Sequence, residues 1–411
     1  MDETGADILI IGGGIGGLTL ALALHRAGVP CRVFEAAPEI KPLGVGINLL
    51  PHSTAVLGGL GLEPALASVA ITTKESVYFT RFGQLIYREP AGRAAGHATP
   101  QFSIHRADLH RVLVDAVVER LGADRFRPGW KCAGFDQDDG GVTVQFADAT
   151  TGAALEPQRG AAAIGCDGIH SVMRKQLHPS EGDPIYSGVN MWRGTTVWEP
   201  ILTGASMIRA GWLTPAKIVL YPIRDNVDGR GRQLVNWVVE IETPTHLARD
   251  WNRRGRLDDF LGPLESWHFD WLDVPALIRA AQQVFEFPMV DQDPLPFWTR
   301  GRVTLLGDAA HPMYPRGSNG AGQAIVDAQV LAALLARHAD VRDALVDYQF
   351  ERLPATAAVV KMNRTNPPDA ILREVQLRSG DQPFRSIDEV MSRREMEDLL
   401  SRYRQVTGNV R

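Results

Sequence analysis

The amino-acid sequence predicts an α/β fold in which an α/β domain is interrupted by an antiparallel sheet and followed by C-terminal helices. Three observations predict it. An apolar run, a glycine-rich turn and a helical stretch follow one another over residues 8–27, as in a strand–turn–helix unit. Between about residues 180 and 290, alternating aromatic-rich segments indicate antiparallel strands. The pattern of a buried strand followed by a helix then returns over residues 302–337.

The composition narrows the class of protein. The chain has 411 residues, a net charge of −5 and scattered Lys and Arg residues, which argues against nucleic acid or a membrane as partner. Its three cysteines form no CxxC pair, so no metal site or disulfide framework is indicated and a reducing cytoplasm is expected. The apolar stretch 8–24 is glycine-rich and follows acidic residues, so we interpret it as a buried strand and helix rather than a signal segment.

The N-terminal elements carry the first motif. Residues 8–11 are a continuous apolar run, typical of a parallel strand buried on both faces, residues 18–27 have helical composition, and residues 29–35 are the second strand. Between the first strand and the helix, Gly12-Gly-Gly-Ile-Gly-Gly17 fits GxGxxG. This arrangement predicts a Rossmann-like dinucleotide site.

Each part of this motif has a physical role. Gly12 permits the tight turn, Gly14 lets a pyrophosphate approach the backbone, and Gly17 lets helix and strand pack closely. The helix N-terminus offers free N–H groups and a partial positive charge to the phosphates. Glu35 closes the second strand, where its carboxylate can accept from ribose hydroxyls. The motif leaves FAD and NAD open.

A further predicted strand also ends at polar residues. Residues 107–121 are a predicted helix, and residues 161–165 are a buried strand that runs into Asp167 and Gly168. An Asp-Gly pair by itself is a turn signal, but His170 and Arg174 follow closely enough to reach phosphates.

The strand at residues 303–307 ends in Gly307 and Asp308 and favours FAD over NAD, because this carboxylate can accept from the hydroxyls of a ribityl chain. A glycine-rich loop follows and opens a helix over residues 320–337, with Ser318 or Asn319 as its expected cap. That helix start would direct positive potential at the flavin edge that becomes negative on reduction.

These motifs, in this order, resemble the class A flavoprotein monooxygenases, which have the para-hydroxybenzoate hydroxylase-like fold. The resemblance covers nearly the whole chain and is strongest to the phenazine-hydroxylating members; the matching segments are residues 42–48, 103–106, 191–194, 288–291 and 307–321. It implies a GR2-type FAD-binding domain in two parts (1–180 and 291–365), an inserted antiparallel-sheet substrate domain (181–290) and a C-terminal helical tail (366–411).

The resemblance also implies roles for individual residues. The expected FAD-binding residues are Gly12, Gly14, Ile15, Gly16, Gly17, Glu35, Ala36, Val45, Gly46, Arg106, Asp167, Gly307, Asp308, Asn319, Gly320 and Ala321. His170 and Arg174 are NAD(P)H candidates, and His311 and Tyr314 could relay a substrate proton, although a histidine in a tight turn is more often structural. The substrate candidates are Trp192, Tyr221, Asn236 and Trp237, although aromatics on alternating strands are more often core.

The implied reaction is hydroxylation of an aromatic or heteroaromatic small molecule, phenazine-like rings included, by NAD(P)H and O2 through a flavin C4a-hydroperoxide, in a monomer or homodimer. Hydroxybenzoate-type enzymes clamp the substrate carboxylate with an arginine in the inserted sheet, and near Ile223 we find none. A small benzoate is therefore not favoured. We expect substrate to accelerate flavin reduction at least about tenfold. Two interpretations stay open for Gly44, Gly46, Gly317 and Gly320: they leave room for the ring to shift, or they only let loops pack.

Other classes of flavoprotein share some of these motifs. A flavin-dependent halogenase should carry WxWxIP and a disulfide oxidoreductase a cysteine pair, and this sequence has neither. A non-catalytic flavin-binding module that signals redox state to a partner stays open. Stimulation of NAD(P)H consumption by an aromatic compound separates it from an enzyme.

Overall fold

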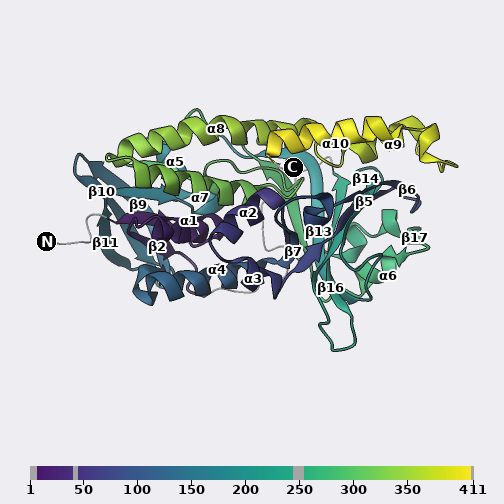
Figure 1. The fold of residues 1–411 in the computed structure, drawn as a ribbon, viewed down its shortest axis with the longest axis horizontal. Coiled ribbons are helices and arrows are strands. Elements are labelled where there is room, and N and C mark those ends of the chain that lie inside the picture. Colours follow the sequence, from purple (N-terminus) through teal and green to yellow (C-terminus); the bar gives the residue numbers. More distant parts are fainter. Residues whose placement is uncertain (1–6, 40–44, 244–253, 409–411) are drawn as a thin grey trace.

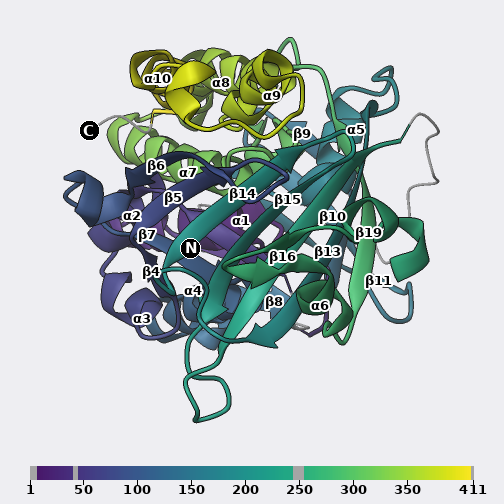
Figure 2. The same ribbon diagram turned by 90° about the vertical axis from the view of Figure 1, so that its right-hand side faces the viewer.

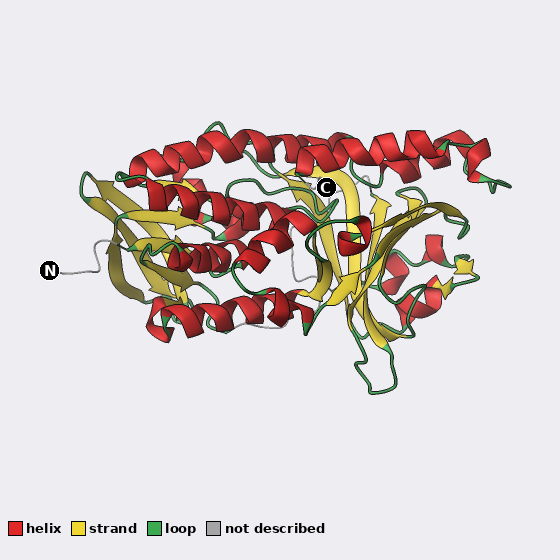
Figure 3. Cartoon of the chain, viewed as in Figure 1, coloured by secondary structure: helices red, strands yellow, loops and turns green. Residues whose placement is uncertain are grey.

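The protein is described by a computed structural model that covers residues 7–39, 45–243 and 254–408. The molecule is elongated, with helices and short strands in one half and a large sheet in the other (Figure 1). Figure 3 shows that long helices run along one side of both halves. No helix among the described residues is long and apolar enough to cross a membrane.

The α/β half is built on a five-stranded parallel sheet, as predicted. Its order is β20 (Val303–Leu305), β12 (Ala162–Gly165), β1 (Ile8–Ile11), β2 (Cys31–Glu35), β8 (Phe126–Pro128). The central strands are buried on both faces, which is why they read as continuous apolar runs. The carboxyl ends of β1, β2, β12 and β20 therefore bring the predicted motifs to one edge.

Three helices pack around this sheet: α1 (Ile15–Arg26), α4 (Arg106–Leu121) and α7 (Gly320–Arg337). Helix α7 has the predicted bounds. Helix α1 begins three residues earlier than the predicted helical stretch, because Gly14 is extended at its N-cap and two motif glycines lie within its first turn.

The second half is a seven-stranded sheet that is antiparallel except between β14 and β5. Five of its strands lie within or at the edge of the predicted range of about 180–290, among them β15 and β16, which hold the alternating segments 217–221 and 234–240. The order is β19 (Val284–Asp291), β13 (Ile185–Trp198), β16 (Gln233–Glu242), β15 (Ala216–Arg224), β14 (Ser206–Trp212), β5 (Glu75–Phe79), β6 (Leu85–Pro90). Strands β5 and β6 precede residue 181, so the sheet is not made by the inserted segment alone, and the domain limits stay a prediction.

The two faces of this sheet differ. One face carries Trp192 and Trp237, which pack with Phe260 and Trp267 beneath the segment that contains α6 (Val274–Arg279). Figure 2 looks onto this half, with α6 in front of the sheet. The other face is turned toward the α/β half and carries charged side chains.

The C-terminal helices of the predicted fold class are present: α8 (Val341–Thr365) precedes the predicted tail, and α9 (Ala370–Ser379) and α10 (Arg393–Thr407) lie within it. These helices span both halves of the molecule (Figure 1). Their apolar side chains, including Ile371 and Leu400, pack with Tyr78, Ile86 and Tyr87 of β5 and β6. The tail is therefore part of the wall of the sheet domain.

The remaining elements fill the space around these layers. A three-stranded sheet (β3, β7, β4) joins the two halves, and another (β11, β10, β9) flanks the parallel sheet. Their bounds are β3 (Gly46–Leu49), β4 (Ile71–Thr73), β7 (Gln101–His105), β9 (Trp130–Asp138), β10 (Gly141–Asp148), β11 (Ala154–Gly160), β17 (His268–Phe269), β18 (Leu272–Asp273), α2 (Pro51–Gly59), α3 (Glu63–Ala67) and α5 (Val172–Leu177).

Candidate active site

The glycine-rich turn has the geometry of a phosphate cradle. Gly12 has φ +112°, and a Cβ there would lie 2.3 Å from the Cys166 carbonyl oxygen. A Cβ on Gly17 would lie 2.0 Å from the Gly12 carbonyl oxygen. Beside Gly14, in contrast, no atom lies within 4 Å of the Cβ position. The two outer glycines are thus required by packing and the middle one leaves open space at the N-terminus of α1, which fits a dinucleotide pyrophosphate.

The carboxylate of Glu35 is fixed beside this cradle. Its Oε2 accepts from the Gly13 backbone N–H at 2.7 Å and its Oε1 from the Ala37 N–H at 2.7 Å. Ala36 is exposed next to it, and Ile15 and Gly16 form the first turn of α1. The predicted ADP-binding residues are therefore brought together at one edge of the parallel sheet.

The second predicted cofactor segment also comes together. Gly307 has φ +64°, and the exposed Asp308 places Oδ1 3.8 Å from the Cβ position of Gly320 at the start of α7. Ala321 follows in the first turn. Asn319 occupies the N-cap position, but its side chain caps nothing and instead donates to Gly317 and Tyr403. The expected capping role is therefore wrong.

Two side chains of the Asp-Gly segment are hydrogen-bonded to other parts of the protein. Asp167 accepts from the backbone of Val172 and Met173 and so holds the start of α5. Arg174 is buried, ion-paired with Glu181, and donates to the Ala309 and Ala310 carbonyls at 2.9 Å. This guanidinium is not accessible to a nucleotide, which corrects the NAD(P)H expectation for Arg174. His170 is exposed.

The two proton-relay candidates are both buried in the fold. His311 is buried, and its Nε2 lies 2.6 Å from Asp327 Oδ2, which makes it part of an internal ion-pair cluster. Tyr314 is buried in a small apolar cluster; burial, then the carboxylate of Asp291, raises its pKa to about 12. Neither lines the described cavities, so both relay expectations are corrected.

Val45 and Gly46 lie where the two halves meet. The Gly46 N–H donates to Asn236 Oδ1 at 2.7 Å, and the Gly46 carbonyl accepts from Arg193 Nη2 at 3.1 Å. Arg106 begins α4 beside them, its backbone N–H bonded to the Val45 carbonyl, with its side chain exposed. Gly44 and residues 42–43 lie outside the described residues.

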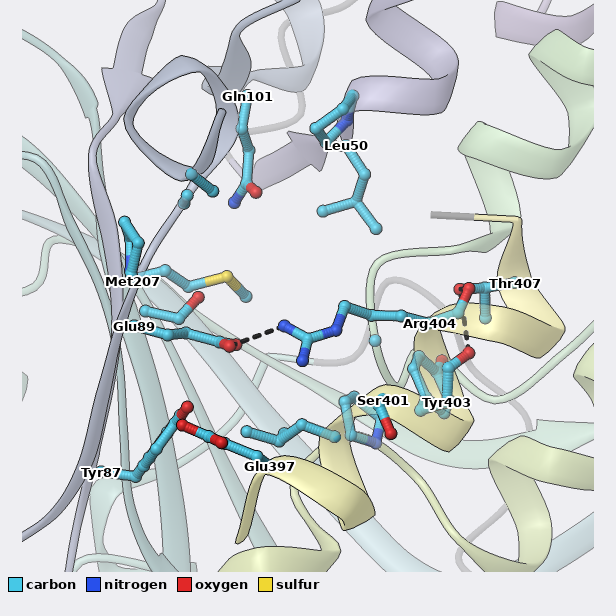
Figure 4. A pocket seen from close by; sticks show the side chains of 18 of the residues that line it. Leu50, Tyr87, Glu89, Gln101, Met207, Glu397, Ser401, Tyr403, Arg404 and Thr407 are labelled. Atoms are coloured by element: carbon cyan, nitrogen blue, oxygen red, sulfur yellow. Dashed lines mark hydrogen bonds and ion pairs between the residues drawn. The ribbon is translucent and has the colours of Figure 1, made fainter. Parts of the chain in front are cut away.

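Two cavities adjoin this junction and have four lining residues in common: Met207, Arg209, Gly317 and Ser318. The larger, about 600 Å³, lies between β5–β6 and α10 (Figure 4). The smaller, about 70 Å³, lies between the charged face of the sheet and residues 315–318. Together they form a path from the C-terminal helix to the glycine-rich loop before α7.

The strand register decides which substrate candidates reach this path. Tyr221 lines the smaller cavity, and Asn236 is paired with it in the register and holds Gly46. Trp192 and Trp237 lie in the apolar core of the opposite face. As substrate residues the two tryptophans were wrong, because neighbouring positions on a strand point to opposite faces.

The smaller cavity is rich in positive charge. Lys217 is neutralised there by Glu240, at 2.7 Å, and by Asp369. Three arginines also line it, and no carboxylate of the described residues is ion-paired with any of them: Arg193, Arg209 and Arg316. Four cationic side chains therefore face two carboxylates, which leaves this cavity electropositive.

Arg209 is the most isolated of these cations. It is only 7% exposed, its Nη1 has no hydrogen-bond partner, and its Nη2 reaches only the sulfur of Met207 at 3.4 Å. The ring of Tyr78 lies 5.1 Å away. Sequence reasoning missed this residue, although an arginine in the otherwise apolar run of β14 is a visible signal.

Comparison with known proteins agrees with this geometry. The FAD binding domain family model matches residues 5–191 and 288–363, which is more than half of the chain. Phenazine 1,6-dicarboxylic acid hydroxylase PhzS of Lysobacter antibioticus is 44% identical over 88% of this chain and 90% of its own. The chain belongs to the class A flavoprotein monooxygenases. It is an FAD-dependent aromatic hydroxylase, for which NAD(P)H is the usual reductant, and the redox-signalling alternative is not supported.

Other relatives show the breadth of the family. The 6-hydroxynicotinate 3-monooxygenase of Bordetella bronchiseptica is 30% identical over 80% of this chain and 82% of its own. Among solved structures, Klebsiella pneumoniae HpxO complexed with FAD and uric acid has a TM-score of 0.78 and 25% identity, covering 98% of this chain and 97% of that one. The predicted fold class and cofactor are therefore confirmed.

Proposed function

We propose that this enzyme hydroxylates a multi-ring heteroaromatic acid of the phenazine type, using NAD(P)H and O2. The observation that carries the proposal is the unpaired, buried guanidinium of Arg209 at the junction of the two cavities. A buried charge without a partner is strongly unfavourable. A carboxylate on the substrate would supply the missing partner and two strong hydrogen bonds.

The cavity dimensions support a substrate larger than one ring. A space of about 600 Å³ lies within the range of drug-sized ligand sites, and the smaller cavity extends it toward the glycine loop. A single benzoate would leave most of that space to water. The relative named for phenazine 1,6-dicarboxylic acid points to the same class: flat, fused rings with carboxylates.

The residues present fit FAD, as the open space beside Gly14 indicates. Glu35 and Ala36 would hold the adenosine ribose, and Ile15 and Gly16 the pyrophosphate. The ribityl chain and ring would be held by the last part of the predicted set, Val45, Gly46, Arg106, Gly307, Asp308, Asn319, Gly320 and Ala321. When bound, FAD supplies two-electron chemistry: it accepts a hydride from NAD(P)H and delivers one oxygen atom of O2 to the ring.

The side chains of the cavity bind and orient the substrate. Tyr221 has its pKa raised by burial, despite the nearby Arg193, so its hydroxyl keeps its proton and can donate to a substrate oxygen or nitrogen. Arg193 is hydrogen-bonded both to Tyr221 and to the Gly46 carbonyl. It therefore fixes the position of the Tyr221 ring relative to the flavin-binding segment. The apolar side chains of Met191, Val219 and Val238 exclude water from the reacting carbon.

The overall reaction balances as aromatic acid, NAD(P)H, H⁺ and O2 giving hydroxylated acid, NAD(P)⁺ and water. We place it in the cytoplasm, where the three free cysteines, Cys31, Cys132 and Cys166, would stay reduced.

The test uses the FAD-loaded enzyme with NADH or NADPH and four compounds: phenazine-1,6-dicarboxylate, phenazine-1-carboxylate, unsubstituted phenazine and 3-hydroxybenzoate. We expect the phenazine acids to stimulate NAD(P)H oxidation most, and the product to gain one labelled oxygen under ¹⁸O2. A preference for unsubstituted phenazine or 3-hydroxybenzoate would contradict the proposed substrate class. Label arriving from water would contradict the reaction.

A further inference from the structure

Helix α10 contacts the glycine-rich loop before α7 through one buried tyrosine. Asn319 Nδ2 donates to the Tyr403 hydroxyl at 2.6 Å, and that hydroxyl donates to Asn363 Oδ1 at 2.7 Å. The Arg316 carbonyl lies 3.3 Å from the same oxygen. A Cβ on Gly317 would lie 2.0 Å from it, so the loop is shaped around this hydroxyl.

A second bond ties α10 to α7 itself. Gln323 Nε2, in the first turn of α7, donates to the Thr407 carbonyl at 3.1 Å. The same glutamine accepts from Arg352 of α8, which is ion-paired with Asp327. The end of α10 is therefore bonded to the helix start that follows the loop, as well as to the loop.

The residue next to Tyr403 faces the larger cavity. Arg404 Nη1 lies 2.6 Å from Glu89 Oε2 of β6, and this ion pair spans the cavity between sheet and helix (Figure 4). Both side chains are partly exposed, at 33% and 17%. A partly exposed ion pair of this kind contributes little to stability, so a ligand that enters the cavity can displace it.

We propose that α10 couples occupation of the cavity to the loop that holds the flavin, with Tyr403 as the positioning residue and the Arg404–Glu89 pair as the contact that a substrate breaks. The inference rests on the proposed function for the place of the flavin beside residues 316–320. With the pair closed, Tyr403 holds the loop and NAD(P)H reduces the enzyme slowly. When substrate separates Arg404 from Glu89, α10 and the loop loosen and reduction accelerates.

The first test concerns Tyr403 and needs no substrate. Tyr403→Phe removes the hydroxyl, which takes one acceptor from Asn319 Nδ2 and the donor from Asn363 Oδ1, so we expect FAD to bind about tenfold more weakly, measured by flavin fluorescence. Tyr348→Phe is the matched control, because it removes another buried tyrosine hydroxyl, which donates to the Leu305 carbonyl rather than to the loop. Equal FAD affinity in the two variants would overturn the positioning role.

The second test concerns Arg404 in the FAD-loaded enzyme. We expect Arg404→Gln to raise the substrate-free rate of flavin reduction at least about threefold, with a matching rise in H2O2 formed from O2. We expect Arg404→Lys to restore the slow rate in large part. Arg402→Gln is the control, since Arg402 is exposed on the same helix and lines neither cavity.

A substrate-free rate that is the same in Arg404→Gln, Arg402→Gln and the parent would overturn the coupling. Failure of the proposed function gives a different result: no aromatic acid stimulates turnover, while the FAD affinities of the tyrosine variants still differ.

Discussion

Two of the buried charged clusters among the described residues are built differently. In the α/β half, Asp327 is bonded to His311 at 2.6 Å and to Arg352 at 2.7 Å, so its carboxylate is fully paired. In the cavity, Arg209, Arg193 and Arg316 outnumber the carboxylates and keep unpartnered nitrogens. The first cluster holds helices together, whereas we propose that the second is completed by the carboxylate of a substrate. Pairing, rather than charge or burial alone, separates structure from function here.

The largest expected effect breaks the paired cluster. Asp327→Asn leaves Arg352 buried without a carboxylate, so we expect the free energy of unfolding to fall by about 3–5 kcal/mol. Asp347→Asn is the matched control, because Asp347 is paired with His338 on the surface, at 3.0 Å. Its loss should cost less than about 1 kcal/mol. Urea denaturation of both variants makes the measurement, and equal losses would refute the contrast.

The same cluster predicts a pH dependence. Burial alone would raise the pKa of Asp327, but His311 and Arg352 outweigh it and hold the pKa below its usual 3.8. A lowered pKa adds stability above the pH at which the unfolded carboxyl titrates, and this stability is lost as pH falls through the folded pKa. The stability difference between parent and Asp327→Asn should therefore shrink below about pH 4. A constant difference from pH 6 to pH 3 would contradict the assignment.

Asp308 supplies an intermediate effect, because it is an exposed carboxylate beside the start of α7. Asp308→Ala should weaken FAD binding by about 1.5–3 kcal/mol, the value of a charge-assisted hydrogen bond, with little change in folding. Asp388→Ala, at an exposed carboxylate of the C-terminal segment, is the control. Fluorescence titration with FAD separates the two, and unchanged affinity would make Asp308 a turn residue only.

The smallest expected effect has the opposite sign. Arg209→Met replaces an unpaired buried charge with an apolar side chain, so we expect the substrate-free protein to gain about 1 kcal/mol of stability. Thermal unfolding without ligand makes the measurement. A clear loss of stability would mean that Arg209 supports the fold, as Asp327 does.

The sequence was sufficient for the features that depend on local order. The strand–turn–helix around Gly12–Gly17, the start of α7 at Gly320 and the FAD class are confirmed because turn chemistry and periodicity lie within a few residues. The roles of His311, Tyr314 and Arg174 were misjudged because their partners come from other segments, such as Asp327 for His311 and the Ala309 and Ala310 carbonyls for Arg174.

The cavity was harder to predict for a related reason. Alternation on β13 and β16 shows that two faces exist, but not which one meets the glycine loop, and so the tryptophans were placed on the wrong face. The contribution of β5, β6 and α10 to the site depends on packing between segments more than 300 residues apart, such as Glu89 and Arg404.

The comparison of affinities in the parent and in Arg209→Met tests the account most directly. Phenazine-1-carboxylate and unsubstituted phenazine are titrated into each FAD-loaded protein and followed by flavin absorbance. We expect the parent to bind the acid more tightly, and the variant to lose about 1.5–3 kcal/mol of affinity for the acid alone. Equal losses for the acid and the neutral ring, or no loss for either, would contradict a carboxylate bound at Arg209.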